Sequence, residues 1–92
     1  MYLRPDKDSL EKFRAYISSS ADCEQLSADE WVVDIYEPEP ALSLNIVFEG
    51  DKIRVDGAEY MAFSEELDGW YISGSVPDAD ALEEILRNAG AY

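Results

Sequence analysis

Apolar residues recur with the period of a helix near both ends of the chain. Residues 8–18 carry them at intervals of three and four, and Asp8 with Glu11 fits the capping box of a helix start. Near the other end, Pro77 and Asp78 precede a second run of this kind and Gly90 follows it, as is typical of helix ends. The expected apolar stripes are Leu10, Phe13 and Ile17 in the first helix, and Ala79, Leu82, Ile85, Leu86 and Ala89 in the second.

Between the two helices the apolar period changes to two, which predicts strands. The clearest alternation covers residues 42–48, where every second residue is Leu, Ile or Phe. Asp56-Gly57 is typical of a tight hairpin turn, and it separates two short apolar runs. The predicted strands are residues 31–36, 42–48, 53–55, 59–63 and 70–73. Residues 18–30 are expected to form a loop.

This order of elements predicts an α+β fold. Strands joined by short turns pair antiparallel, because parallel strands need long crossover connections. Two amphipathic helices bury their stripes most simply on one face of the resulting sheet. We therefore expect residues 1–92 to form a single small acidic domain. Its predicted architecture is a five-stranded antiparallel meander with an N-terminal and a C-terminal helix packed on one face, in the order αβββββα.

The distribution of charge along the chain says more about its surface than the overall composition does. The chain has 21 Asp and Glu against 7 Lys and Arg, for a formal net charge of −14. Residues 15–51 and residues 55–86 carry nine carboxylates each and contain no Lys or Arg. Unpaired carboxylates are costly to bury, so most of them must lie on the surface. The resulting field attracts basic surfaces and repels nucleic acid and anionic membranes.

Several kinds of chemistry have no residues to carry them. There is no histidine, the glycines occur singly, and no stretch matches a calcium-binding loop. The single cysteine, Cys23, lies between Asp22 and Glu24, which raise the pKa of a thiol and make it less reactive. We therefore expect no enzymatic activity, no cofactor and no metal site. No signal peptide or stretch of about 20 apolar residues occurs, so a cytoplasmic protein is expected.

The acidic surface predicts a function. The most strongly basic protein surfaces are those that bind nucleic acid, and alternate carboxylates on a strand lie about 6.6 Å apart, a spacing comparable to that of phosphates. In size, charge and composition the chain is similar to small acidic inhibitors, including phage anti-CRISPR and anti-restriction proteins and other DNA mimics. This similarity includes no sequence motif. It implies a non-enzymatic inhibitor that blocks the basic nucleic-acid-binding surface of a nuclease or defence effector.

Four alternatives stay open. An immunity or antitoxin protein would use the same acidic surface against one cognate toxin. An adaptor or structural module would instead use an exposed aromatic patch, because Tyr and Trp are common interface anchors. Outward aromatic residues could also produce a homodimer. Finally, the carboxylates could serve solubility alone.

The predicted contacts are carboxylates from several segments, with two tyrosines as anchors. Trp31 and Trp70 are assigned to the core, and Tyr71 is expected to point away from it. The predicted protein-binding residues are Asp34, Tyr36, Glu37, Glu39, Glu65, Glu66, Asp68, Tyr71, Asp80 and Glu84.

Overall fold

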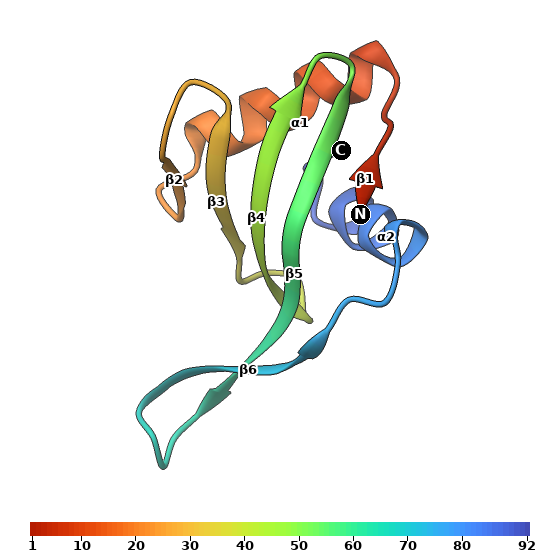
Figure 1. The fold of residues 1–92 in the computed structure, drawn as a ribbon. Coiled ribbons are helices and arrows are strands. Elements are labelled where there is room, and N and C mark those ends of the chain that lie inside the picture. Colours follow the sequence, from red (N-terminus) through yellow and green to blue (C-terminus); the bar gives the residue numbers. More distant parts are fainter.

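Six strands and two helices make up the protein (Figure 1). The computed structural model describes residues 1–92. In chain order the elements are β1 (Tyr2–Leu3), α1 (Lys7–Ser19), β2 (Cys23–Gln25), β3 (Glu30–Ile35), β4 (Ala41–Glu49), β5 (Lys52–Ser64), β6 (Gly69–Ser75) and α2 (Ala79–Asn88). Neither helix has the length and apolar character needed to cross a membrane.

All six strands belong to one antiparallel sheet. Strands β2 to β6 form a meander in which each strand pairs with the next. The short β1 adds a sixth strand, because Tyr2 and Leu3 pair with Arg54 and Ile53 of β5. The spatial order is β1-β5-β4-β3-β2, with β6 also on β5. The predicted α+β class and antiparallel meander are confirmed, but the sheet has six strands instead of five.

Two strand assignments differ from the prediction. Residues 23–25, expected in a loop, form β2 and pair with residues 31–33 of β3. The hairpin predicted at Asp56-Gly57 is wrong, because β5 continues through both residues. The register shifts there, so that Val55 pairs with Ile46 and Gly57 with Asn45. Asp56 is therefore the extra residue of a β-bulge, and the inward alternation resumes at Ala58.

The helix ends are set by side-chain and backbone caps. Asp6, not the predicted Asp8, is the N-cap of α1, because its Oδ1 accepts a hydrogen bond from the Ser9 N–H at 2.8 Å. Asp78 caps α2 in the same way, accepting from the Ala81 N–H at 2.9 Å. Gly90 follows the C-terminal end of α2 with φ 75°, the left-handed conformation that glycine adopts without strain.

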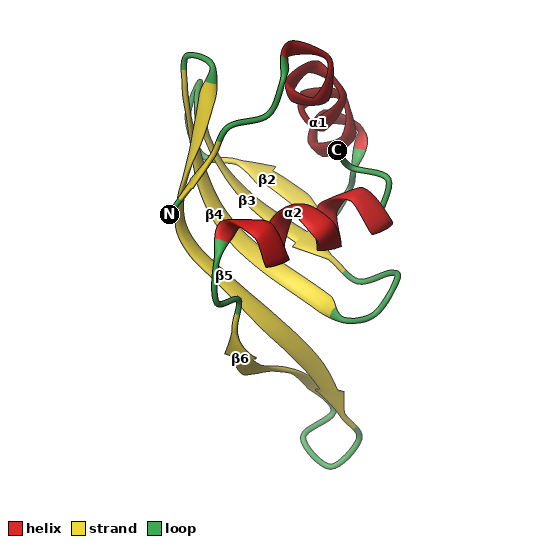
Figure 2. Ribbon diagram, turned by 90° about the vertical axis from the view of Figure 1, so that its right-hand side faces the viewer, coloured by secondary structure: helices red, strands yellow, loops and turns green.

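Both helices pack on the same face of the sheet (Figure 2). Phe13 and Ile17 of α1, with Leu82 and Leu86 of α2, are buried against it, as the apolar stripes predict. The Phe13 ring lies 6.2 Å from the ring of Phe48 on β4. The sheet contributes Val33, Ile35, Leu42, Leu44, Ile46, Phe48, Ile53, Val55 and Ala58 to the same core.

The end of β5 and most of β6 project beyond this core. Strand β4 pairs with β5 only as far as Met61 of β5, so residues 62–64 of β5 pair with β6 alone. We call residues 62–72 the projecting hairpin, which extends past the end of β4 in Figure 1. The prediction that Trp70 belongs to the core is wrong, because its side chain lies on this hairpin and is 46% exposed. Trp31 is half-buried and packs against the core.

Candidate protein-binding surface

Most of the negative charge is not neutralised by the protein itself. Arg54 contacts Glu49 at 2.7 Å and Asp56 at 2.9 Å, and Arg87 contacts Glu83 at 2.9 Å. These three carboxylates are the only ones in ion pairs, which leaves eighteen of the 21 unpaired. No charged residue is buried. Most of the eighteen unpaired carboxylates are therefore exposed to solvent without a neutralising cation.

Several of the basic side chains lie over aromatic rings. The Arg14 guanidinium lies 3.8 Å from the centre of the Phe48 ring. Arg4 and Lys52 both lie over the Tyr2 ring, at 5.7 and 4.7 Å. Such cation–π contacts hold these cations on the protein surface without pairing them with a carboxylate.

The end of β3 and the segment between β3 and β4 carry four predicted contact residues. Asp34 is half-buried and accepts a hydrogen bond from the Ser43 hydroxyl at 2.8 Å. Tyr36, Glu37 and Asp34 line a concavity of about 330 Å³. Burial, followed by the charge of Asp34, raises the pKa of Tyr36. Glu39, which is exposed, lines a second concavity next to the hairpin.

The turn of the projecting hairpin carries a second predicted group. Glu65, Glu66 and Asp68 are all exposed there. The Asp68 N–H donates to the Glu65 carbonyl at 3.2 Å, and the Leu67 N–H donates to the Ser64 hydroxyl at 3.2 Å. These bonds hold the turn, so the three carboxylates occur at the tip of the hairpin.

The remaining predicted carboxylates lie elsewhere. Asp80 and Glu84 are exposed on α2, which packs with α1 on the core face of the sheet (Figure 2). They form a separate acidic group and do not extend the surface at the hairpin.

Sequence reasoning missed an apolar surface on the hairpin. Phe63 pairs with Trp70 and Met61 pairs with Ile72, so strand alternation places all four side chains on one face. The Trp70 ring lies 5.6 Å from Phe63 at 71° and 4.9 Å from Tyr36 at 52°. We call Tyr36, Met61, Phe63, Trp70 and Ile72 the apolar hairpin face. The predicted anchor Tyr71 is exposed on the opposite face of the hairpin.

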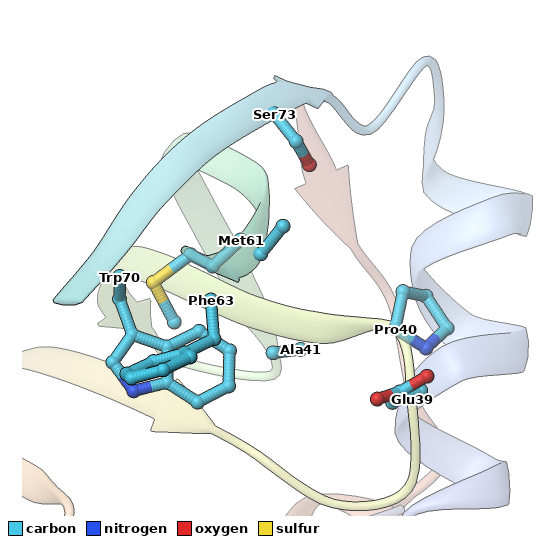
Figure 3. Close-up of a pocket in the computed structure, with 8 residues that line it drawn as sticks. Glu39, Pro40, Ala41, Met61, Phe63, Trp70 and Ser73 are labelled. Carbon is cyan, nitrogen blue, oxygen red and sulfur yellow. The ribbon is translucent and has the colours of Figure 1, made fainter. Parts of the chain in front are cut away.

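A concavity separates this face from the segment before β4. Its lining includes Pro40, Met61, Phe63 and Trp70, with Glu39, and its volume is about 390 Å³. Figure 3 shows Met61, Phe63 and Trp70 grouped on one side of the concavity, with Pro40 and Glu39 on the other. The concavity therefore combines an apolar lining with one carboxylate.

The single cysteine, Cys23, lies near two carboxylates. Cys23 is half-buried on β2 and free of disulfide bonds. The pKa of its thiol is raised, as predicted, although burial is the main cause and Asp34 and Asp22 contribute less. No group of three or more Cys, Asp or Glu side chains is arranged to hold a metal ion.

Comparisons with protein-family profiles, curated protein sequences and solved structures found no match to this chain. Its function is therefore inferred from its own residues.

Proposed function

We propose that this chain is a non-enzymatic acidic inhibitor that binds and blocks the basic nucleic-acid-binding surface of a nuclease or defence effector. The observation that supports the proposal most is that eighteen of 21 carboxylates form no ion pair. A charge of −14 on a small domain opposes folding through self-repulsion, so a surface kept in this state has a compensating use.

The inhibitor would act by occupying the site of the nucleic acid. Lysine and arginine side chains that neutralise phosphates also bind carboxylates, through charge-assisted hydrogen bonds. The carboxylates at the hairpin tip and those of the β3–β4 segment supply the contacts, and the net field accelerates association. Binding would then be fast, stoichiometric and weakened by salt.

A second candidate is an immunity or antitoxin protein, which would direct the same surface against one cognate toxin. A third candidate, an adaptor, is favoured by a specific observation. The apolar hairpin face exposes aromatic side chains that the core does not use. The adaptor differs from the inhibitor in one measurable respect, because apolar binding changes little with salt.

Charge reversal with a charge-matched control tests the inhibitor proposal. The test variant carries Glu65→Lys, Glu66→Lys and Asp68→Lys at the hairpin tip. The control variant reverses three exposed carboxylates of the β2 strand, the β2–β3 loop and the β4–β5 turn: Glu24→Lys, Asp29→Lys and Asp51→Lys. Each reversal changes the charge by two, so both variants carry −8 instead of −14 and differ only in where the charge is lost.

The probe is the heparin-retained protein fraction of a nuclease-treated bacterial lysate, because heparin retains proteins with basic nucleic-acid-binding surfaces. The immobilised wild-type chain is expected to capture a basic protein and release it as NaCl rises. The tip variant should capture much less of it, and the control variant nearly as much as wild type. Equal capture by both variants, or capture that is insensitive to salt, would contradict the proposal.

A further inference from the structure

The projecting hairpin concentrates the exposed apolar side chains of the molecule. Eight large hydrophobic residues are exposed in the whole chain, and five of them lie within residues 63–72. Phe63 is 51% exposed and Ile72 62% exposed, although both lie on paired strands. Clustered apolar exposure of this kind marks interaction sites in soluble proteins, whereas scattered exposure is ordinary. The hairpin is therefore built for contact and contributes little to the core.

The apolar hairpin face is also pre-organised. The Trp70 ring is held between Phe63 and Tyr36, at 5.6 and 4.9 Å, and Tyr36 itself is half-buried. Backbone pairing of residues 62–64 with residues 69–71 fixes the strands that carry these rings. Aromatic rings fixed before binding lose little conformational entropy on association, and Trp and Tyr are enriched in interface hot spots.

Carboxylates flank this face at both ends. Glu39 lies at one end of the face, and the tip carboxylates Glu65, Glu66 and Asp68 lie at the other. Residues 55–86 contain no Lys or Arg that could neutralise them. A second copy of this chain would bring identical carboxylates together across a two-fold contact, and both copies carry −14. A partner with cations around an apolar pocket fits both features.

We infer that the apolar hairpin face is the anchoring hot spot of the interface, with Trp70 at its centre, and that it inserts into an apolar pocket beside the cationic surface of the basic partner. This inference rests on the proposed function, and it adds a second property of the partner, which is an apolar pocket beside the cationic surface. Carboxylates steer the partner and set its orientation, while Trp70, Phe63 and Ile72 set how slowly it leaves.

Substitutions on the apolar hairpin face and away from it test this division. The probe is the protein that the wild-type chain captures from the heparin-retained fraction, purified and titrated by calorimetry. Trp70→Ala is expected to weaken binding about thirty-fold or more, the size typical of a hot-spot truncation. Ile72→Ala on the same face should weaken it by a smaller factor. Leu26→Ala in the β2–β3 loop, an exposed apolar residue outside this face, should stay within about three-fold of wild type.

A spectroscopic readout does not depend on the folding of any variant. The wild-type chain has two tryptophans, so labelling with 5-fluorotryptophan gives two ¹⁹F resonances. Adding the captured protein should shift or broaden the Trp70 resonance and leave that of Trp31, which packs against the core, nearly unchanged. The inference would be overturned if the Trp70 ¹⁹F resonance stayed unchanged on addition of the captured protein and Trp70→Ala bound with wild-type affinity.

The outcomes separate this inference from the proposed function. If the tip charge reversals weaken binding and Trp70→Ala does not, the inhibitor proposal stands and the hot spot is wrong. If Trp70→Ala abolishes binding and the charge reversals have no effect, then the assumption that the partner is basic, which both proposals share, is wrong. Sedimentation that shows a dimer dissolved by Trp70→Ala would assign the face to a second copy and would also overturn the inference.

Discussion

Replacing Tyr92 by phenylalanine should stabilise the protein. The Tyr92 hydroxyl is the one buried side-chain polar atom without a hydrogen-bond partner, and the residue is only 8% exposed. Its ring lies 6.2 Å from Phe13 in a tilted contact, which phenylalanine preserves. A buried polar group without a partner costs about 1–3 kcal/mol, so we expect the free energy of unfolding at pH 7 to rise by about 1 kcal/mol.

The same substitution should remove a loss of stability at alkaline pH. Burial, followed by the charge of Glu83, raises the pKa of Tyr92 from 10.0 to about 12. The folded state therefore holds the phenolic proton more tightly than the unfolded state. The resulting stability is fully present below pH 10 and is lost as pH rises through 12. Linkage gives a loss of about 1.4 kcal/mol by pH 11 and up to about 2–3 kcal/mol above pH 12.

Urea unfolding followed by circular dichroism at pH 7, 9 and 11 measures both effects. Tyr16 and Tyr36 also have raised pKa values and remain in the variant, so wild type and variant share their contribution. The stability difference between the two proteins should therefore widen between pH 9 and pH 11. A Tyr92→Phe protein that is less stable at pH 7, or that loses as much stability as wild type by pH 11, would refute this reasoning.

Three further predictions concern the fold. Leu44→Ala in the core should lower the free energy of unfolding by about 2–5 kcal/mol. Leu26→Ala on the exposed loop should change it by less than about 0.5 kcal/mol. Similar losses for both variants, measured by chemical denaturation, would contradict the assigned core. Asp78→Ala should cost about 1 kcal/mol by removing the N-cap of α2, and a melting temperature equal to that of wild type would argue against the cap. NaCl should raise the melting temperature, because it screens eighteen unpaired carboxylates, and a decrease on addition of NaCl would show that their repulsion is unimportant.

Elements with a strong local pattern could be predicted from the sequence. The stripes around Phe13 and Leu82 and the alternation around Leu44 contain their own periodicity, so helix and strand follow directly. Residues 23–25 have no such pattern, because β2 exists only through its pairing with β3. Asp56-Gly57 matched a hairpin turn, but two residues of that kind can equally form a bulge when both flanking runs pair with one long partner strand.

The site was harder to predict because a strand's period does not reveal what covers its faces. Trp70 alternates as a core residue would, yet it lies on the part of the hairpin that β4 does not reach. The mismatch between β5, with 13 residues, and β4, with 9, is the property that exposes the hairpin, and it depends on pairing between distant segments. The carboxylates could be assigned to the surface from composition, and Glu65, Glu66 and Asp68 are neighbours in the sequence, but their separation from Asp80 depends on the fold.

Competition with nucleic acid is the most direct measurement of the proposed inhibition. The captured basic protein is first bound to a fluorescently labelled DNA or RNA duplex, and the chain is then titrated while anisotropy is recorded. We predict release of the nucleic acid at one chain per binding site. Release should weaken with Glu65→Lys, Glu66→Lys and Asp68→Lys but persist with the charge-matched control. A stable ternary complex, in which the chain binds and the nucleic acid stays, would contradict the account.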